Sequence, residues 1–212
     1  MIDKLFTPGP RVKFDIKSLY EGHHKISYRG IKALKSPFDY VIYQMLIWEL
    51  KPDLIIEVGT NKGGTALYFA DLLDKLGKGE VHTIDIIKGQ SDLLLNSNSR
   101  IKLFTEGYKE YDLEMTRNFK NILVIEDSSH RYEDTLAVME KFSTVVTKNS
   151  YLIIEDGIIT ELGMEKEYNG GPLKAINEFL SINTNFVIDR KWCDLFGINA
   201  TFNVNGFLKK LN

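Results

Sequence analysis

The sequence predicts an α/β protein with a doubly wound, mainly parallel sheet of seven strands and an antiparallel edge strand. From residue 37 onward, short apolar runs alternate with segments of helical length, a pattern typical of consecutive βαβ units. The inner runs are apolar at almost every position, as expected for strands that helices cover on both faces. Several of these runs also end on an acidic residue, at the end where open parallel sheets bind their ligands.

Four helices are expected along the chain. Ser36 or Pro37 begins the first helix and Pro52 follows its end, since proline is compatible with a helix start but not with its continuation. Gly77 is expected to end the second helix, because glycine readily adopts the left-handed conformation that closes a helix. The expected helices cover residues 37–50, 63–77, 132–146 and 171–182.

Seven strands are expected between and after these helices. The first five are short apolar runs rich in β-branched residues, and the helical segments between them indicate parallel pairing. The last two are expected to form an antiparallel, hairpin-like edge. The expected strands cover residues 53–58, 80–86, 100–106, 121–127, 150–156, 186–190 and 200–210.

The 212 residues fit one domain over residues 37–212, preceded by an arm or lid over residues 1–36 that shows no regular pattern. Apolar residues make up 43% and charged residues 26%, which is an ordinary globular mixture. The net charge of −2 gives no general attraction to nucleic acid or anionic membranes. The single cysteine, Cys193, suits a reducing compartment, and no apolar run approaches the about 20 residues of a membrane span. We expect a cytoplasmic protein without nucleic-acid or membrane partners.

Acidic residues stand at the carboxyl ends of the first five expected strands. Those ends meet at one edge of a parallel sheet, where ligands bind. Any one of these acids is equally consistent with a solvated position or a helix N-cap, but their recurrence favours a site. The acids are Glu57, Asp85, Glu106, Asp127 and the adjacent pair Glu155 and Asp156.

The turn after the first strand, "EVGTNKGG", contains three glycines. Glycine lets the backbone turn tightly and approach a ligand without a Cβ in the way. The spacing G-x-x-x-G-G differs from the G-x-G-x-x-G of dinucleotide sites, and Glu57, two residues before Gly59, repels phosphate. The turn therefore favours a cation or a hydroxyl-bearing ligand over a pyrophosphate.

This turn resembles the first motif of class I S-adenosylmethionine-dependent methyltransferases, E/D-x-G-x-x-x-G, and so implies their Rossmann-like fold. In that family the glycine backbone packs against the amino-acid part of the cofactor, and an acid ending the second strand receives both ribose hydroxyls. Asp85 stands at that place, and an ionised carboxylate suits a diol because it offers only acceptors. The resemblance implies a cofactor site of Glu57, Gly59, Thr60, Gly63, Gly64, Asp85, Glu106, Gly107, Tyr108 and Asp127, with the segment 106–108 beside the adenine.

A closer resemblance covers the chain from about Tyr28 to its C-terminus. The segments "YRGIKALKSPFDYVIYQMLIWEL", "DSSH", "SYLIIEDG", "GGPLKAINEFL" and "TFNVNGFLKK" together resemble the cephalosporin hydroxylase family, also called the rhamnosyl O-methyltransferase family. Hydroxylation by non-haem iron requires two histidines and a carboxylate. None of the four histidines forms the usual His-x-Asp/Glu pair, so methyl transfer is favoured.

Members of this family resemble catechol O-methyltransferases in carrying a divalent metal on carboxylates beside the cofactor. The matching positions are Asp127, Glu155 and Asp156. Three carboxylates at neighbouring strand ends repel one another unless a cation or protons intervene, and hard oxygen ligands suit Mg²⁺. The alternative is that Asp127 and Asp156 only cap the following helix or turn. Glu126 is left out, because alternation along the strand turns it to the other face.

The expected reaction is attack of a metal-activated substrate hydroxyl on the sulfonium methyl group. Asp127 is expected to act in catalysis through the metal. His130 is the candidate general base or substrate contact, since its ordinary pKa lies near neutrality; a histidine at this place is as often a cap or a solvated residue.

Three functional hypotheses stay open at the level of the sequence. The first is a Mg²⁺-dependent O-methyltransferase that acts on a hydroxyl of a sugar or a polyhydroxylated natural product. The second is a metal-independent small-molecule methyltransferase, and the third is a non-catalytic cofactor-binding protein of a biosynthetic cluster. The family resemblance also implies a homo-oligomer.

Overall fold

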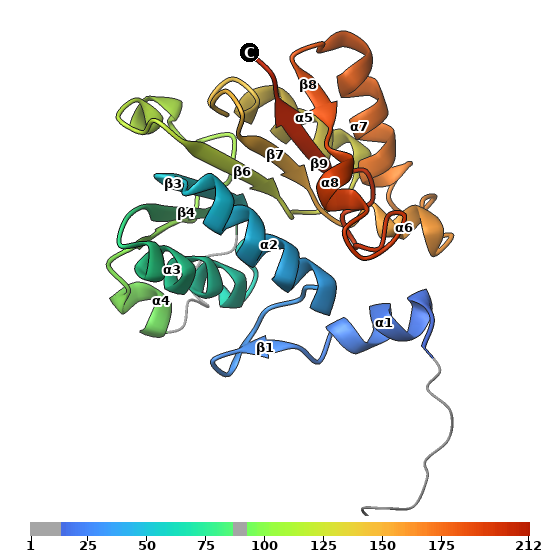
Figure 1. The fold of residues 1–212 in the computed structure, drawn as a ribbon, viewed down its shortest axis with the longest axis horizontal. Coiled ribbons are helices and arrows are strands. Elements are labelled where there is room, and N and C mark those ends of the chain that lie inside the picture. The colour runs from blue at the N-terminus through green and yellow to red at the C-terminus, as the bar shows by residue number, and fades with distance from the viewer. Residues whose placement is uncertain (1–13, 87–92) are drawn as a thin grey trace, which may run out of the picture.

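The computed structural model describes residues 14–86 and 93–212. A seven-stranded sheet with the order β5-β4-β3-β6-β7-β9-β8 runs through the molecule, with helices on both faces (Figure 1). This confirms the predicted α/β fold of the class I methyltransferase type. The strands are β3 (Leu54–Val58), β4 (Glu80–Ile84), β5 (Ile101–Phe104), β6 (Ile122–Glu126), β7 (Tyr151–Ile154), β8 (Phe186–Ile188) and β9 (Phe207–Lys210).

Pairing within the sheet is parallel from β5 to β7 and antiparallel beyond it. The last strand of the chain, β9, inserts between β7 and β8 and runs opposite to both. The antiparallel edge was expected, but its second strand is shorter than predicted and begins only at Phe207. Residues 200–205 do not join the sheet, because their polar groups are used elsewhere: the carbonyl of Phe202 accepts from Ile158 N, and its amide donates to Asp39.

Two separate apolar layers cover the sheet, one on each face. Side chains that alternate along each strand divide between them, since successive residues of a strand point to opposite faces. On β3, for example, Ile55 packs in the layer of α2 and α3, whereas Leu54 and Ile56 pack in the layer of α5 and α7. The long helices are α2 (Pro37–Leu50), α3 (Gly64–Leu76), α5 (Tyr132–Phe142) and α7 (Gly171–Ile182).

Shorter elements fill the connections. Helix α5 ends at Phe142, four residues before its predicted end, because the following residues turn toward β7. The connecting helices are α4 (Leu93–Ser97), η2 (Leu113–Thr116), α6 (Ile158–Glu161) and α8 (Arg190–Cys193). In the described ranges, no helix is both long and apolar enough to cross a bilayer.

The segment before residue 37 is more regular than the sequence suggested. It contains α1 (Ile16–His23) and a two-stranded hairpin of β1 (Ser27–Tyr28) and β2 (Ile31–Lys32). Asp15 and Ser18 form a capping box at the start of α1, a D-x-x-S signal that the sequence interpretation missed. Residues 1–13 of the expected arm 1–36 lie outside the described residues, and the division at residue 37 stays a prediction.

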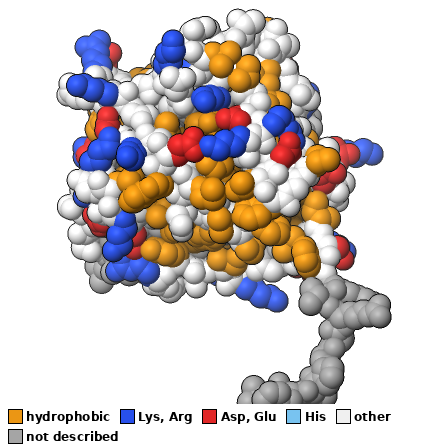
Figure 2. Space-filling model, viewed as in Figure 1, with side chains coloured by type: hydrophobic (Ala, Val, Ile, Leu, Met, Phe, Trp, Pro, Cys, Tyr) orange, Lys and Arg blue, Asp and Glu red, His pale blue; other side chains and the backbone are white. Residues whose placement is uncertain are grey.

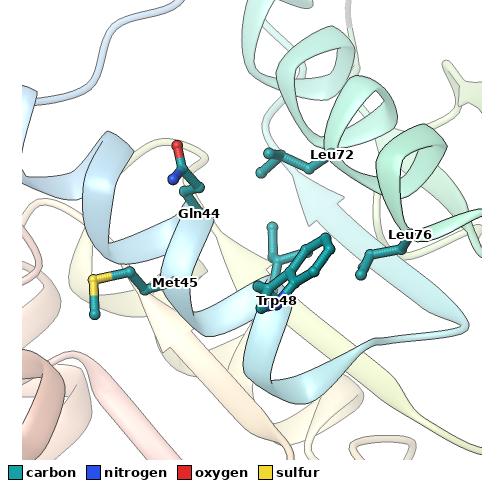
Figure 3. A pocket seen from close by; sticks show the side chains of 6 residues that line it. Gln44, Met45, Trp48, Leu72 and Leu76 are labelled. Atoms are coloured by element: carbon teal, nitrogen blue, oxygen red, sulfur yellow. The ribbon is translucent and has the colours of Figure 1, made fainter.

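A shallow apolar groove lies between the C-terminal halves of α2 and α3 (Figure 3). Its lining includes Met45, Trp48, Leu72 and Leu76, and Trp48 is 58% exposed. Apolar side chains gather over this face of the molecule (Figure 2). Both helices point their C-termini toward the amino ends of the strands, so the groove lies away from the edge where the acidic residues gather.

A buried carboxylate ties the start of α2 to the C-terminal loop. Asp39 is 1% exposed and accepts hydrogen bonds from Ser36 Oγ at 2.6 Å, from Phe202 N at 3.1 Å and from the hydroxyl of Thr201. Burial raises the pKa of Asp39, while these donors lower it. The segment 201–204 is thereby held against the helix that leads into β3.

Replacing Asp39 with alanine is expected to destabilise the protein by about 3 kcal/mol, because Thr201 and the Phe202 amide lose a buried acceptor. Urea unfolding at neutral pH followed by circular dichroism measures this change. The matched control is Glu49→Ala, which removes an exposed carboxylate paired with Lys191 and should cost under about 0.5 kcal/mol. Equal losses for the two variants would contradict the structural role of Asp39.

Candidate functional site at the carboxyl ends of the strands

The carboxyl ends of β3, β6 and β7 bring the predicted acids together. These three strands are adjacent and parallel. Their hydrogen bonding extends one residue past the strand ends, since Asp127 N donates to Val58 O and Glu155 N donates to Glu126 O. Alternation turns Glu126 to the α5 face, where it accepts from Ser128 and Thr135. The edge therefore carries Asp127, Glu155 and Asp156 beside the glycine turn that follows β3.

The glycines of that turn are required by the protein's own packing. Gly59 has a φ of +111°, and a Cβ at this position would lie 1.9 Å from the carbonyl oxygen of Asp127. A Cβ on Gly64 would lie 2.3 Å from the carbonyl oxygen of Lys32 in the arm. Gly63, with a φ of +82°, precedes α3 and offers no side-chain cap to its first amides, so that these donors are available to a ligand.

The second expected cofactor element follows β4 and β5. Asp85 accepts hydrogen bonds from Asn61 N at 2.9 Å and from Ile86 N at 2.7 Å, which places its carboxylate against the glycine turn. Gly107 N donates to the carbonyl of Asp85, and Gly107 has a φ of +83°. Glu106 is exposed and Tyr108 is half-buried beside it, so the residues expected at the ribose and the adenine lie on neighbouring strand ends.

Glu57 lies beneath the turn and is fully buried. Its Oε2 accepts a hydrogen bond from Thr83 Oγ1 at 2.6 Å, and the hydroxyls of Thr83 and Thr60 are 2.7 Å apart. Burial raises the pKa of Glu57 to about 8, although the charge of Lys35 opposes the shift. Its Oε1 has no hydrogen-bond partner among the described residues, so that one buried acceptor of the site stays available.

Lys35 is a central residue of the site that the sequence interpretation missed. Its side chain is 2% exposed, and its ammonium lies 2.5 Å from Asp127 Oδ2 and 2.7 Å from Glu155 Oε2. Burial lowers the pKa of Lys35, but the carboxylates of Asp127 and Glu155 outweigh it and hold the pKa well above its usual value. The only local signal is its position directly before the start of α2, and buried lysines are too rare to be expected there.

The two predicted carboxylates that contact Lys35 are strongly perturbed. Burial raises the pKa of Asp127, with Lys35 and His130 acting in the opposite direction. Burial and then the charge of Asp127 raise the pKa of Glu155 well above its usual range. Glu155 Oε1 also accepts from Tyr43 OH at 2.6 Å. Glu155 is buried and Asp127 is partly exposed, and both lie in a charge-dense position, where pKa shifts are typical of functional sites.

His130 and Asp156 form the outer part of the same site. His130 Nε2 lies 3.2 Å from Asp156 Oδ2, and ligand atoms of Asp127, His130 and Asp156 lie within 4.8 Å of one another. His130 and Asp156 have φ values of +58° and +54°, a left-handed conformation that is uncommon outside glycine and frequent at functional sites. The carboxylate oxygens of Asp127 and Asp156 suit a divalent cation such as Mg²⁺, whereas the carboxylate of Glu155 is paired with Lys35.

Aromatic residues from distant segments surround this outer part. The ring of Tyr168 lies 6.2 Å from that of His130, in the loop that leads to Gly170 and Gly171. On the arm, His23 is buried and packs edge-on against Phe202, with the ring centroids 5.3 Å apart. Burial and then the charge of Asp156 raise the pKa of Tyr20 on α1.

Residues 21–211 match the family model described as Rhamnosyl O-methyltransferase/CmcI. The chain belongs to this family. It is therefore an S-adenosylmethionine-dependent O-methyltransferase, and the predicted family is confirmed.

Relatives of known designation support this assignment. The chain is 29% identical over 217 residues to a rhamnosyl O-methyltransferase of Mycobacterium leprae, covering 96% of this chain and 93% of the relative. It is 30% identical over 188 residues to that of Mycobacterium tuberculosis, covering 82% and 75%. A solved CmcI structure designated Mg-SAM superposes with a TM-score of 0.69 at 19% identity, covering 100% of this chain and 84% of the other.

Gly59→Ala is expected to lower the free energy of unfolding of this methyltransferase by more than about 2 kcal/mol, because the added Cβ forces the turn away from Asp127. Thermal and urea unfolding measure the loss, and titration with S-adenosylhomocysteine should show weaker binding by the folded variant. Gly22→Ala is the control, since a Cβ there meets nothing within 4 Å. A Gly59 variant as stable as the control would refute the close approach.

Proposed function

We propose that this family member transfers the methyl group of S-adenosylmethionine to a hydroxyl of a sugar, with Mg²⁺ bound beside the cofactor. The observation that carries this proposal is the approach of Asp127, His130 and Asp156, whose ligand atoms lie within 4.8 Å of one another, with Glu155 joined to Asp127 through Lys35. A cofactor-binding domain without catalysis has no need for such a group of like charges.

The cofactor is proposed to lie across the ends of β3, β4 and β5. Asp85 suits the two ribose hydroxyls as an acceptor, and its bonds to Asn61 N and Ile86 N fix the carboxylate in place. The backbone of Gly59, Thr60, Gly63 and Gly64 approaches the amino-acid part, with the buried carboxyl group of Glu57 beneath it. Glu106, Gly107 and Tyr108 border the adenine.

Asp127, Glu155 and Asp156 are the proposed metal ligands. Their oxygens match the preference of Mg²⁺, and their mutual repulsion is relieved by a cation. Bound there, Mg²⁺ supplies Lewis-acid chemistry that lowers the pKa of an acceptor hydroxyl. Asp127 is proposed to contribute to catalysis by helping to orient the acceptor hydroxyl toward the methyl donor.

His130 is the proposed general base. Its imidazole takes the proton of the acceptor hydroxyl as the new O–CH₃ bond forms, while the S–CH₃ bond breaks and leaves neutral S-adenosylhomocysteine. Asp156, 3.2 Å away, stabilises the imidazolium that results, and the bound geometry aligns the reacting atoms.

The names of the relatives support a sugar as the acceptor, with rhamnosyl groups as the first candidates. Tyr168 lies beside His130, and aromatic faces suit the apolar faces of sugar rings. A homo-oligomer, a cytoplasmic location and the absence of nucleic-acid or membrane partners stay predictions.

One observation favours a metal-independent methyltransferase as the second candidate. Lys35 already places a positive charge between Asp127 and Glu155, so that these carboxylates are compensated without a metal. Chelation separates the two hypotheses.

Asp85→Ala is expected to weaken binding of S-adenosylhomocysteine at least about tenfold, because the ribose hydroxyls lose a charged acceptor. Isothermal titration calorimetry on the metal-free protein gives the dissociation constants. Asp74→Ala is the control, since it removes an exposed carboxylate of α3 that pairs with Arg100. Unchanged affinity in the Asp85 variant would rule out the proposed ribose contact.

Removal of divalent metal with EDTA is expected to lower turnover about a hundredfold or more, because the acceptor hydroxyl is no longer activated. Added MgCl₂ should restore the wild type but not Asp156→Ala, whereas Asp53→Ala, at a surface pair with Lys78, should recover fully. Mass detection of a methyl gain on a panel of rhamnosides and other sugars measures turnover. Full activity after chelation would favour the metal-independent hypothesis.

A further inference from the structure

We infer that Lys35 is the internal counter-ion of the metal site, so that its ammonium and the divalent cation compete for Asp127 and Glu155. This inference rests on the proposed function, in which these two carboxylates and Asp156 hold the metal. It assigns to Lys35 a positioning role: the lysine sets the affinity for the metal without touching the substrate or cofactor.

The contacts of Lys35 place its charge between the two carboxylates. The ammonium is within 2.7 Å of one oxygen of each, and the second oxygen of Glu155 accepts from Tyr43 OH. Both oxygens of Glu155 therefore already have a donor, and a cation that binds Glu155 has to displace Lys35 or share an oxygen with it.

The backbone around Lys35 holds it at this position. Lys35 N donates to Ala33 O at 3.0 Å, and the next residue, Ser36, caps α2 through its hydroxyl. The Ser36 hydroxyl in turn donates to the buried Asp39. The side chain reaches across the sheet edge from a fixed point, so that a small change of its rotamer is the available way to release the carboxylates.

The charges of the buried site leave little alternative to such a counter-ion. Glu57, Asp127 and Glu155 gather in one region, and Glu57 adds to the negative potential at Lys35. Glu57 Oε1 has no partner in the described part of the chain. Without the positive charge of Lys35, the metal-free protein would hold these carboxyl groups together against strong mutual repulsion.

A purely structural ion pair between the arm and the sheet gives a different expectation. In that case, removal of Lys35 lowers stability and leaves the affinity for metal unchanged or reduced. Competition requires the opposite: loss of the lysine charge weakens the metal-free protein and strengthens its binding of a divalent cation. Metal affinity therefore distinguishes the two roles without any measurement of turnover.

The test compares Mn²⁺ binding by the metal-free wild type and Lys35→Met, followed by the electron paramagnetic resonance signal of free Mn²⁺, which shares the oxygen ligands of Mg²⁺. We expect the variant to bind Mn²⁺ about tenfold more tightly or better, because a charge that opposes the cation is removed. Its unfolding temperature should be lower than that of the wild type without metal and should rise more when metal is added. Lys78→Met, which removes an exposed lysine paired with Asp53, should match the wild type.

A folded Lys35→Met that binds Mn²⁺ no more tightly than the wild type overturns the inference alone, provided that the wild type binds. No Mn²⁺ binding by either protein overturns the inference together with the proposed metal dependence. If Lys35→Met does not fold, the comparison moves to Glu155→Gln against Lys35→Met/Glu155→Gln, in which one negative charge is removed with the lysine. The double variant should bind Mn²⁺ more tightly than Glu155→Gln, and equal or weaker binding overturns the inference.

Discussion

The repulsion among buried carboxylates is the physical constraint on which this site depends. Parallel strands direct their carboxyl ends to one edge, and in this chain Glu57 lies near the end of β3, while Asp127 and Glu155 directly follow β6 and β7. Removed from water, such groups require a compensating charge or protons. Lys35 supplies that charge in the structure, and the raised pKa values of Asp127 and Glu155 show how strongly burial still acts on both.

The close approach of backbone segments around the glycine turn is the second constraint. It requires glycine in this turn for packing within the protein, in addition to any contact with a ligand. Gly59 allows the end of β3 to lie against the carbonyl of Asp127, and Gly64 allows α3 to begin against Lys32 of the arm. The glycines that resemble a cofactor motif therefore also allow close packing against Asp127, which follows β6, and against Lys32 of the arm. In the proposed function, a cofactor that packs on this turn lies next to the carboxylates.

The N-terminal arm contributes more to the site than a cover. It carries Lys35, whose ammonium lies at the centre of the acidic cluster, and it places α1 beside the segment of Phe202. Tyr28 and Arg29 anchor the arm to Asp71 on α3, the helix that starts at the glycine turn. The arm, the glycine turn and the acidic cluster thus share one structural support.

The sheet, the four long helices and the gathering of acids at one edge were predictable from the sequence, because periodicity, end signals and parallel topology are local or follow from chain order. The family was predictable from its motifs. Alternation along the strand also predicted correctly that Glu126 faces away from Asp127. Three features were not predictable: the insertion of β9 between β7 and β8, the approach of His130 to Asp156, and the position of Lys35 between Asp127 and Glu155. These contacts join residues far apart in the chain, 92 positions for Lys35 and Asp127, and depend on how completed elements pack. No local pattern carries that information, and a lysine before a helix is ordinarily solvated.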